Sequence, residues 1–135
     1  MVKKYLFISI LIVILDQILK ILFKDKEFFI INYETNTGIA FSLFQGVNRL
    51  IFILIALVII ALVVYYLIKY KPQSKLVNYG LYLMLAGAVS NLIDRIIYGY
   101  VIDYIDLKFW PIFNLADTSN VIGVLLLVIF VIRKK

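Results

Sequence analysis

Residues 50–70 read LIFILIALVIIALVVYYLIKY and contain one charged side chain, that of Lys69. A continuous apolar run of this length can cross a hydrocarbon layer of about 30 Å as a helix. Three further apolar runs lie at about residues 5–23, 76–98 and 113–132. Spans of a β-barrel would be shorter and would alternate in polarity. The sequence therefore predicts an all-α integral membrane protein with four transmembrane helices.

The composition of the whole chain agrees with this fold class. Of its 135 residues 64% are hydrophobic, whereas soluble domains contain about 45–50% apolar residues. The length suits one domain, so we expect residues 1–135 to form a single membrane domain. Its outer loops are expected at about residues 24–49 and 99–112.

The first outer loop has the pattern of a small β-hairpin-like domain. Phe28 to Tyr33 is rich in β-prone residues, and Asn36-Thr37-Gly38 is a turn signal. Residues 39–44 then resume an apolar stretch. We expect this hairpin to lie on the bilayer surface.

Basic residues indicate how the spans are oriented. They gather at the N-terminus, between the second and third spans, and at the C-terminus: Lys3, Lys4, Lys69, Lys71, Lys75, Arg133, Lys134 and Lys135. By the positive-inside rule these places, and both termini with them, are cytoplasmic. All eight acidic residues fall in the outer loops or in the outward halves of spans. The net charge of +6 thus reflects membrane orientation rather than nucleic-acid binding.

Several polar residues are expected inside the membrane. Asp16 and Lys20 are four residues apart in the first span, as are Asn91 and Arg95 in the third, so each pair can meet on one helix face. Ionisable groups at membrane depth are costly unless they are paired, and they are functional candidates for that reason. The simpler interpretation is that both pairs are internal struts of the helix bundle.

The chain has no cysteine and no histidine, which excludes thiol nucleophiles, Ser-His catalysis and the usual zinc sites. No metal or other cofactor is expected. Four aspartates, Asp94, Asp103, Asp106 and Asp117, lie near the outer ends of the last two spans. Two neighbouring carboxyl groups resist ionising together, so one can activate water while the other donates a proton. Spacing alone does not identify the pair.

Other interpretations of these residues remain open. Asn114 or Asp117 could simply cap the fourth helix. In a transporter Asp16, Lys20 and Arg95 could form a charge relay, and in a scaffold protein the aspartates would only cap and pair. A Ser-Lys protease would need Lys20 to meet one of two serines, Ser42 and Ser90.

Four segments, in order, resemble the motifs of lipoprotein signal peptidases, also called signal peptidase II. They are Asp16-Gln17-Ile18-Leu19-Lys20, Asn36-Thr37-Gly38-Ile39-Ala40-Phe41-Ser42, the run from Ala86 to Arg95 with its continuation Gly99-Tyr100-Val101-Ile102-Asp103, and Phe113-Asn114-Leu115-Ala116-Asp117. This resemblance spans nearly the whole chain. It implies a membrane aspartyl endopeptidase that removes the signal peptide of diacylglyceryl prolipoproteins, cutting just before the lipidated cysteine.

The resemblance also implies roles for single residues. Asp103 and Asp117 match the family's catalytic aspartates. Substrate-binding or supporting positions are matched by Asp16, Lys20, Asn36, Gly38, Asn91, Asp94, Arg95, Val101, Asn114 and Ala116. The first-loop hairpin would clamp the substrate peptide or cover the site.

The resemblance further implies where the protein works and what it meets. Its expected partners are the lipid-modified prolipoprotein substrate and membrane lipid, and it is expected to act as a monomer. Its expected location is the bacterial cytoplasmic (inner) membrane, as a multi-pass protein with the active site toward the outer face. Both outer loops are short for the family, which affects the rim of the site more than its chemistry.

Overall fold

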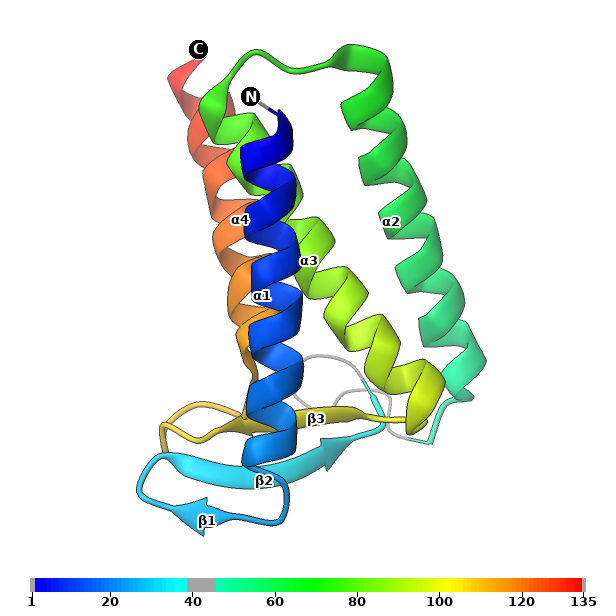
Figure 1. Ribbon diagram of the computed structural model, residues 1–135, viewed down its shortest axis with the longest axis vertical. Coiled ribbons are helices and arrows are strands. Elements are labelled where there is room, and N and C mark those ends of the chain that lie inside the picture. The colour runs from blue at the N-terminus through cyan, green and yellow to red at the C-terminus, as the bar shows by residue number, and fades with distance from the viewer. Residues whose placement is uncertain (1, 39–45, 135) are drawn as a thin grey trace.

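The computed structural model describes residues 2–38 and 46–134 and contains four long helices and a small sheet (Figure 1). The helices are α1 (Val2–Leu22), α2 (Arg49–Tyr70), α3 (Lys75–Ile97) and α4 (Leu115–Arg133). The strands are β1 (Glu27–Phe28), β2 (Ile31–Asn36) and β3 (Val101–Ile105). All four helices are long and apolar enough to cross a membrane, which confirms the four predicted spans.

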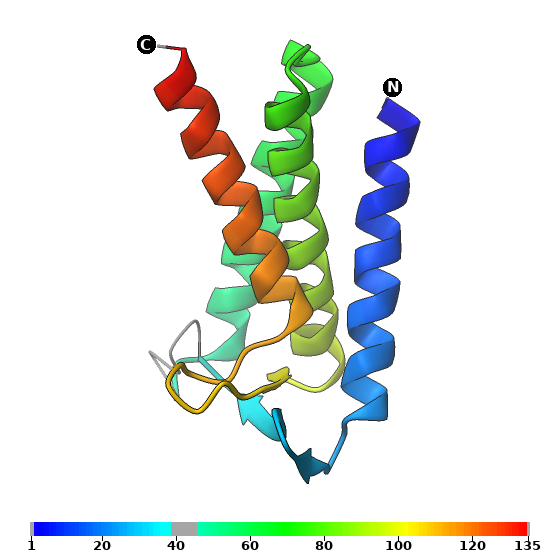
Figure 2. The same ribbon diagram turned by 90° about the vertical axis from the view of Figure 1, so that its left-hand side faces the viewer.

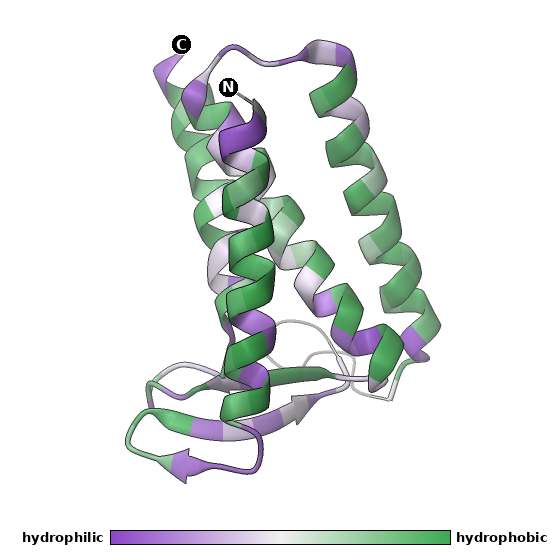
Figure 3. Cartoon of the chain, in the orientation of Figure 1, coloured by the Kyte–Doolittle hydropathy of each residue, from purple (hydrophilic) through white to green (hydrophobic). Residues whose placement is uncertain are grey.

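Many apolar side chains of the helices are exposed. On α2, Leu54, Leu62 and Ile68 are each more than 60% exposed. A helix that is hydrophobic all round is stable when lipid surrounds it. Figure 3 shows hydrophilic residues inside the helical region mainly on the parts of α1 and α3 nearest the sheet. Apart from the basic helix ends near the termini, the polar groups of the bundle therefore lie toward the sheet.

Helix α3 is the centre of the bundle, since it packs against α1, α2, α4 and β3. Glycines bring its backbone against that of α4. A Cβ atom on Gly80 would lie 2.9 Å from the carbonyl oxygen of Gly123, and one on Gly87 would overlap the carbonyl oxygen of Ala116 and the side chain of Asn120. Such small residues allow close helix approach inside a membrane.

The sheet lies across one end of the bundle, while both termini and the α2–α3 connection lie at the other end (Figures 1 and 2). Its strand order is β1-β2-β3, and both pairings are antiparallel. Register places Asn36 opposite Val101 and Glu34 opposite Asp103. The pairing of β2 with β3 thereby joins the first outer loop to the segment that follows α3.

The predicted hairpin-like domain is confirmed, but its turn differs from the expected one. The chain reverses between β1 and β2 at residues 29–30, where Phe29 has a positive φ of 53°. Strand β2 continues to Asn36 because it pairs with β3. The Gly38 N–H then donates to Asn36 Oδ1 over 2.9 Å, which makes a local turn. The apolar stretch at 39–44 lies outside the described residues.

Candidate active site

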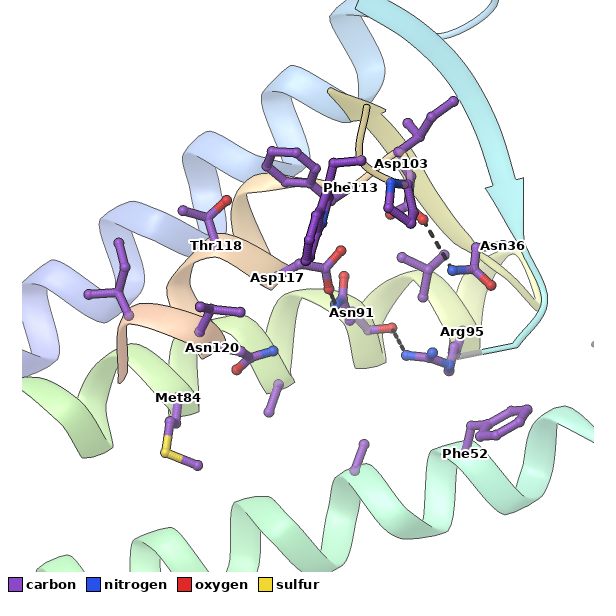
Figure 4. Close-up of a pocket in the computed structure, with 18 of the residues that line it drawn as sticks. Asn36, Phe52, Met84, Asn91, Arg95, Asp103, Phe113, Asp117, Thr118 and Asn120 are labelled. Carbon is purple, nitrogen blue, oxygen red and sulfur yellow. Dashed lines mark hydrogen bonds between the residues drawn. The ribbon is translucent and has the colours of Figure 1, made fainter. Parts of the chain in front are cut away.

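A cavity of about 670 Å³ opens between α2, α3, α4 and the segment before α4. Apolar side chains such as Ile55, Ala88 and Val121 form most of its wall. Its polar end is formed by side chains from β2, α3, β3 and α4, namely Asn36, Asn91, Arg95, Asp103 and Asp117 (Figure 4). Residues distant in sequence therefore meet at one polar site within an apolar chamber.

Asp103 stands on β3 with its carboxylate held by two amides. Asn36 Nδ2 donates to Oδ2 over 3.2 Å and Asn114 Nδ2 donates to Oδ1 over 2.8 Å. The residue is only 3% exposed. Burial, followed by the charge of Asp117, raises the pKa of Asp103 to about 7, although both amides oppose the rise. Near neutral pH this carboxyl group can therefore hold a proton or release it.

Asp117 occupies the first turn of α4 and lines the same cavity. Asn91 Nδ2 donates to its Oδ1 over 2.8 Å. Its other oxygen accepts from the Asn114 N–H, while Asn114 Oδ1 accepts from the Asp117 N–H, and together these bonds form a capping box. The expected capping role is thus confirmed, and the same Asn114 side chain also binds Asp103.

Arg95 ties the end of β2 to α3. Its Nη2 donates to the Gly38 carbonyl over 2.9 Å, and Nη1 donates to the Asn91 carbonyl over 3.5 Å. The guanidinium also lies 5.6 Å from the ring centre of Phe52 on α2. The predicted contact between Asn91 and Arg95 is therefore made to the backbone of Asn91, and Arg95 braces the rim of the cavity.

Behind the cavity lies a buried ionic cluster. Lys20 Nζ lies 2.7 Å from Asp16 Oδ2 and 2.8 Å from Asp94 Oδ2, and all three side chains are at most 1% exposed. Lys20 also donates to Asn91 Oδ1 over 3.1 Å. The predicted pairing of Asp16 with Lys20 is confirmed. Since Asn91 binds both Lys20 and Asp117, the cluster reaches the cavity through one amide.

The remaining predicted site residues surround this centre. Val101 lines the cavity. The fully buried Ala116 donates its N–H to Asp16 Oδ1 over 3.3 Å. Asp94 accepts from the Ile102 N–H over 3.1 Å, which fixes the start of β3 to α3. These contacts are structural supports of the polar end.

The four aspartates that spacing could not separate are now distinguished by their surroundings. Only Asp103 and Asp117 line the large cavity among the described residues. Asp94 belongs to the buried ionic cluster. Asp106 binds Lys108 and Asn32, and its pKa is lowered to about 2, chiefly by the hydrogen bond from Lys108.

The Ser-Lys alternative has no support from the described residues. Ser90 Oγ donates to Asp16 Oδ2 over 2.7 Å, so the hydroxyl is directed to a carboxylate. Lys20 is occupied by Asp16, Asp94 and Asn91. Ser42, like the rest of the 39–42 motif segment, lies outside the described residues.

Sequence reasoning missed Tyr104, which is 1% exposed. Its hydroxyl donates to Asp16 Oδ1 over 3.0 Å and accepts from the Leu115 N–H over 3.1 Å. It thereby links α1 to the start of α4. Strand alternation offered a signal, because Tyr104 must face the side of β3 opposite to Asp103.

Known proteins are similar to this chain over most of its length. The model of the family described as signal peptidase (SPase) II matches residues 8–133. The chain is 41% identical over 114 residues to the lipoprotein signal peptidase of Clostridium novyi (strain NT), which covers 81% of this chain and 76% of the relative. It is also 41% identical over 136 residues to that of Halothermothrix orenii, which covers 91% of both.

Solved structures agree with the sequence comparisons. A bacterial membrane enzyme solved by the in meso method at 2.3 Å resolution superposes with a TM-score of 0.88 at 30% sequence identity. The superposition covers 97% of this chain and 88% of the other. The similarity therefore extends over nearly the whole of this chain.

Proposed function

The chain belongs to the signal peptidase II family of aspartic peptidases, and we propose that Asp103 and Asp117 are the catalytic pair with which it removes signal peptides from prolipoproteins. The observation that carries this proposal is that both carboxyl groups line one cavity and both accept a hydrogen bond from Asn114, Asp103 from its side-chain amide and Asp117 from its backbone N–H. The proposed substrate carries diacylglycerol on a cysteine, and the cut falls just before that cysteine.

The chemistry follows from two carboxyl groups in different protonation states. Asp103 holds the proton, because burial and the charge of Asp117 raise its pKa to about 7. Ionised Asp117 takes a proton from a water molecule, whose oxygen attacks the scissile carbonyl carbon. Asp103 gives its proton to the carbonyl oxygen, which yields a neutral tetrahedral diol.

Collapse of the diol completes the reaction. Asp117, now protonated, gives its proton to the leaving nitrogen while the carbon–nitrogen bond breaks. Asp103 recovers a proton from one diol hydroxyl as the new carboxyl group forms. Both carboxyl groups return to their starting states, so each turnover consumes only one water molecule.

The cavity suits a substrate held by lipid chains. Its wall beyond the polar end is apolar and is formed largely by α2 and by the segment before α4. Acyl chains in such a chamber would hold the scissile bond beside the carboxyl groups, and proximity of this kind contributes greatly to the rate. Asn36 at the end of β2 lines the cavity, which supports the proposed role of the first-loop hairpin as a clamp on the extended peptide.

The assembly and orientation of the enzyme are part of the same proposal. The protein would act as a monomer and a single membrane domain, since one chain supplies every side chain of the polar end. Both termini would face the cytoplasm and the site would face outward. The positions of the basic residues favour this orientation.

Cleavage of a synthetic diacylglyceryl prolipopeptide by the purified protein in detergent tests the catalytic pair. Wild-type protein should cut before the lipidated cysteine. Asp103→Asn and Asp117→Asn should each lose at least about a hundredfold in rate, because each removes a general acid or base. Asp106→Asn, which changes an aspartate outside the cavity, is the matched control and should stay within a few-fold of wild type.

Two results would oppose the proposal. Unchanged cleavage by either variant would remove that carboxyl group from the mechanism. If a well-folded wild-type protein cut none of several substrates, the transporter and scaffold interpretations would regain support.

A further inference from the structure

Asn120 contributes a further polar side chain to the cavity. It lies on α4 three residues after Asp117 and lines the same cavity (Figure 4). Within residues 2–38 and 46–134 its amide makes no hydrogen bond. By contrast, the neighbouring Thr118 hydroxyl donates to the Asn114 carbonyl over 3.1 Å. The Asn120 amide is therefore available to a ligand.

An amide without a hydrogen-bonding partner is energetically unfavourable in the apolar surroundings of Asn120. Met84, Val121 and Ile122 are among the apolar side chains that line this part of the cavity. At three residues beyond Asp117, Asn120 lies about 4.5 Å further along the helix, away from the sheet. Polar side chains at membrane depth are expensive and generally serve a function.

The fold also holds the amide in place. A Cβ atom on Gly87 would overlap Asn120 Oδ1, so the side chain packs directly on the bare backbone of α3. This contact gives the amide a defined place on the cavity wall before any ligand enters, and such preorganisation lowers the entropy cost of binding.

We propose that the Asn120 amide donates a hydrogen bond to an ester carbonyl of the substrate's diacylglyceryl group. This inference rests on the proposed function, and it assigns to Asn120 the recognition of the ester linkage. The scissile peptide meets the carboxyl groups at the polar end, and the acyl chains occupy the apolar chamber. The ester carbonyls lie between these two parts of the substrate, as Asn120 lies between the two parts of the cavity.

Paired substrates test this contact directly. One prolipopeptide carries ester-linked acyl chains, and its partner carries ether-linked alkyl chains of equal length, which lack the carbonyl acceptor. Wild-type protein should prefer the ester in kcat/KM by about 3- to 10-fold, the range expected for one hydrogen bond. Asn120→Leu, which keeps the volume and removes the amide, should cleave both substrates at the ether rate.

A control and a second variant keep this comparison specific. Thr118→Val alters a cavity residue whose hydroxyl is already bonded within the protein, so its ester-to-ether ratio should equal that of wild type. Asn120→Ala removes the same amide with a smaller side chain and should lose the preference like Asn120→Leu. An ester preference that persists in both Asn120 variants, or that wild type lacks, would overturn the proposal.

Binding without cleavage separates this inference from the proposed function. The probe is N-acetylcysteine amide that carries diacylglycerol on sulfur, together with its dialkyl ether analogue; neither has a scissile signal peptide bond. The ester probe should raise the Tm of wild type more than the ether probe, and Asn120→Leu should abolish the difference. Equal shifts in wild type would refute the contact even if cleavage proceeds, and a difference would support it even if cleavage fails.

Discussion

At the scale of single residues, the acidity of Asp103 links the local structure to the pH dependence of the reaction. Its pKa is raised to about 7 by burial and by the charge of Asp117, and the hydrogen bond from Asn36 opposes that rise. If Asp103 supplies the proton, cleavage declines as pH rises through about 7. The midpoint of the alkaline limb of the pH profile then gives the pKa of the Asp103 carboxyl group.

Asn36→Leu should move that limb to higher pH. Without the amide donor the Asp103 carboxylate is less stable, so its pKa increases and it keeps its proton to higher pH. The measurement is kcat/KM against pH. Asn32→Leu is the control, because Asn32 lies on the same strand but donates to Asp106, and its limb should not move. A limb that stays fixed or shifts to lower pH in Asn36→Leu would assign it to another group.

Asn114 illustrates what sequence could and could not predict about single residues. Its capping role was predictable, because the partners are three residues apart along one helix start. Its bond to Asp103 was not, because that contact depends on where β3 lies after α3 ends. This one amide therefore both caps α4 and binds Asp103.

At the scale of elements, the site depends on how closely α3 and α4 approach. Asn91 on α3 donates to Asp117 on α4 over 2.8 Å, and one turn away Gly87 lets the backbones touch. A side chain at position 87 would push the two helices apart. The distance between these helices thus controls a hydrogen bond at the cavity.

Gly87→Val should therefore reduce both stability and activity. Overpacking of this kind costs about 1–3 kcal/mol, and the separation of α3 from α4 should weaken the Asn91–Asp117 bond. Thermal unfolding and cleavage in detergent measure the two effects. Ala61→Val also introduces a valine, at an exposed position of α2, and should change stability by no more than about 0.5 kcal/mol. Equal behaviour of the two variants would show that the close approach is unimportant.

The helices were predictable from sequence and the sheet only in part. Each helix is encoded by one continuous apolar run, which is a local signal. Strand β2 was expected within a hairpin, but its pairing with β3 joins Asn36 to Val101, and no local pattern encodes so distant a contact. Strand alternation indicates which face of β3 Tyr104 occupies, but not its partners, which lie on α1 and α4.

At the scale of the whole molecule, the two ends of the helix bundle differ clearly from each other. The sheet and the polar site are at one end, and both termini and the α2–α3 connection are at the other (Figure 1). In a membrane these ends would face opposite aqueous compartments. The expected orientation can therefore be tested by labelling one position at each end of the molecule.

Single cysteines can answer this question, because the chain has none of its own. Glu27 on β1 and Gln73 between α2 and α3 are both exposed. In intact cells stripped of any outer barrier, a membrane-impermeant maleimide should label Glu27→Cys. It should label Gln73→Cys only after lysis. The reverse pattern would invert the proposed orientation and place the cavity at the cytoplasmic face.

The buried cluster of Asp16, Lys20 and Asp94 has a consequence for biosynthesis. A chain made from its N-terminus presents α1 to the bilayer long before α3, so at that stage Lys20 has only Asp16 as a partner. Because Asp16 and Lys20 are one helical turn apart, the first span can enter the membrane with Asp16 as the counter-ion of Lys20. The cluster is completed in a second stage, when α3 brings Asp94 to the Lys20–Asp16 pair.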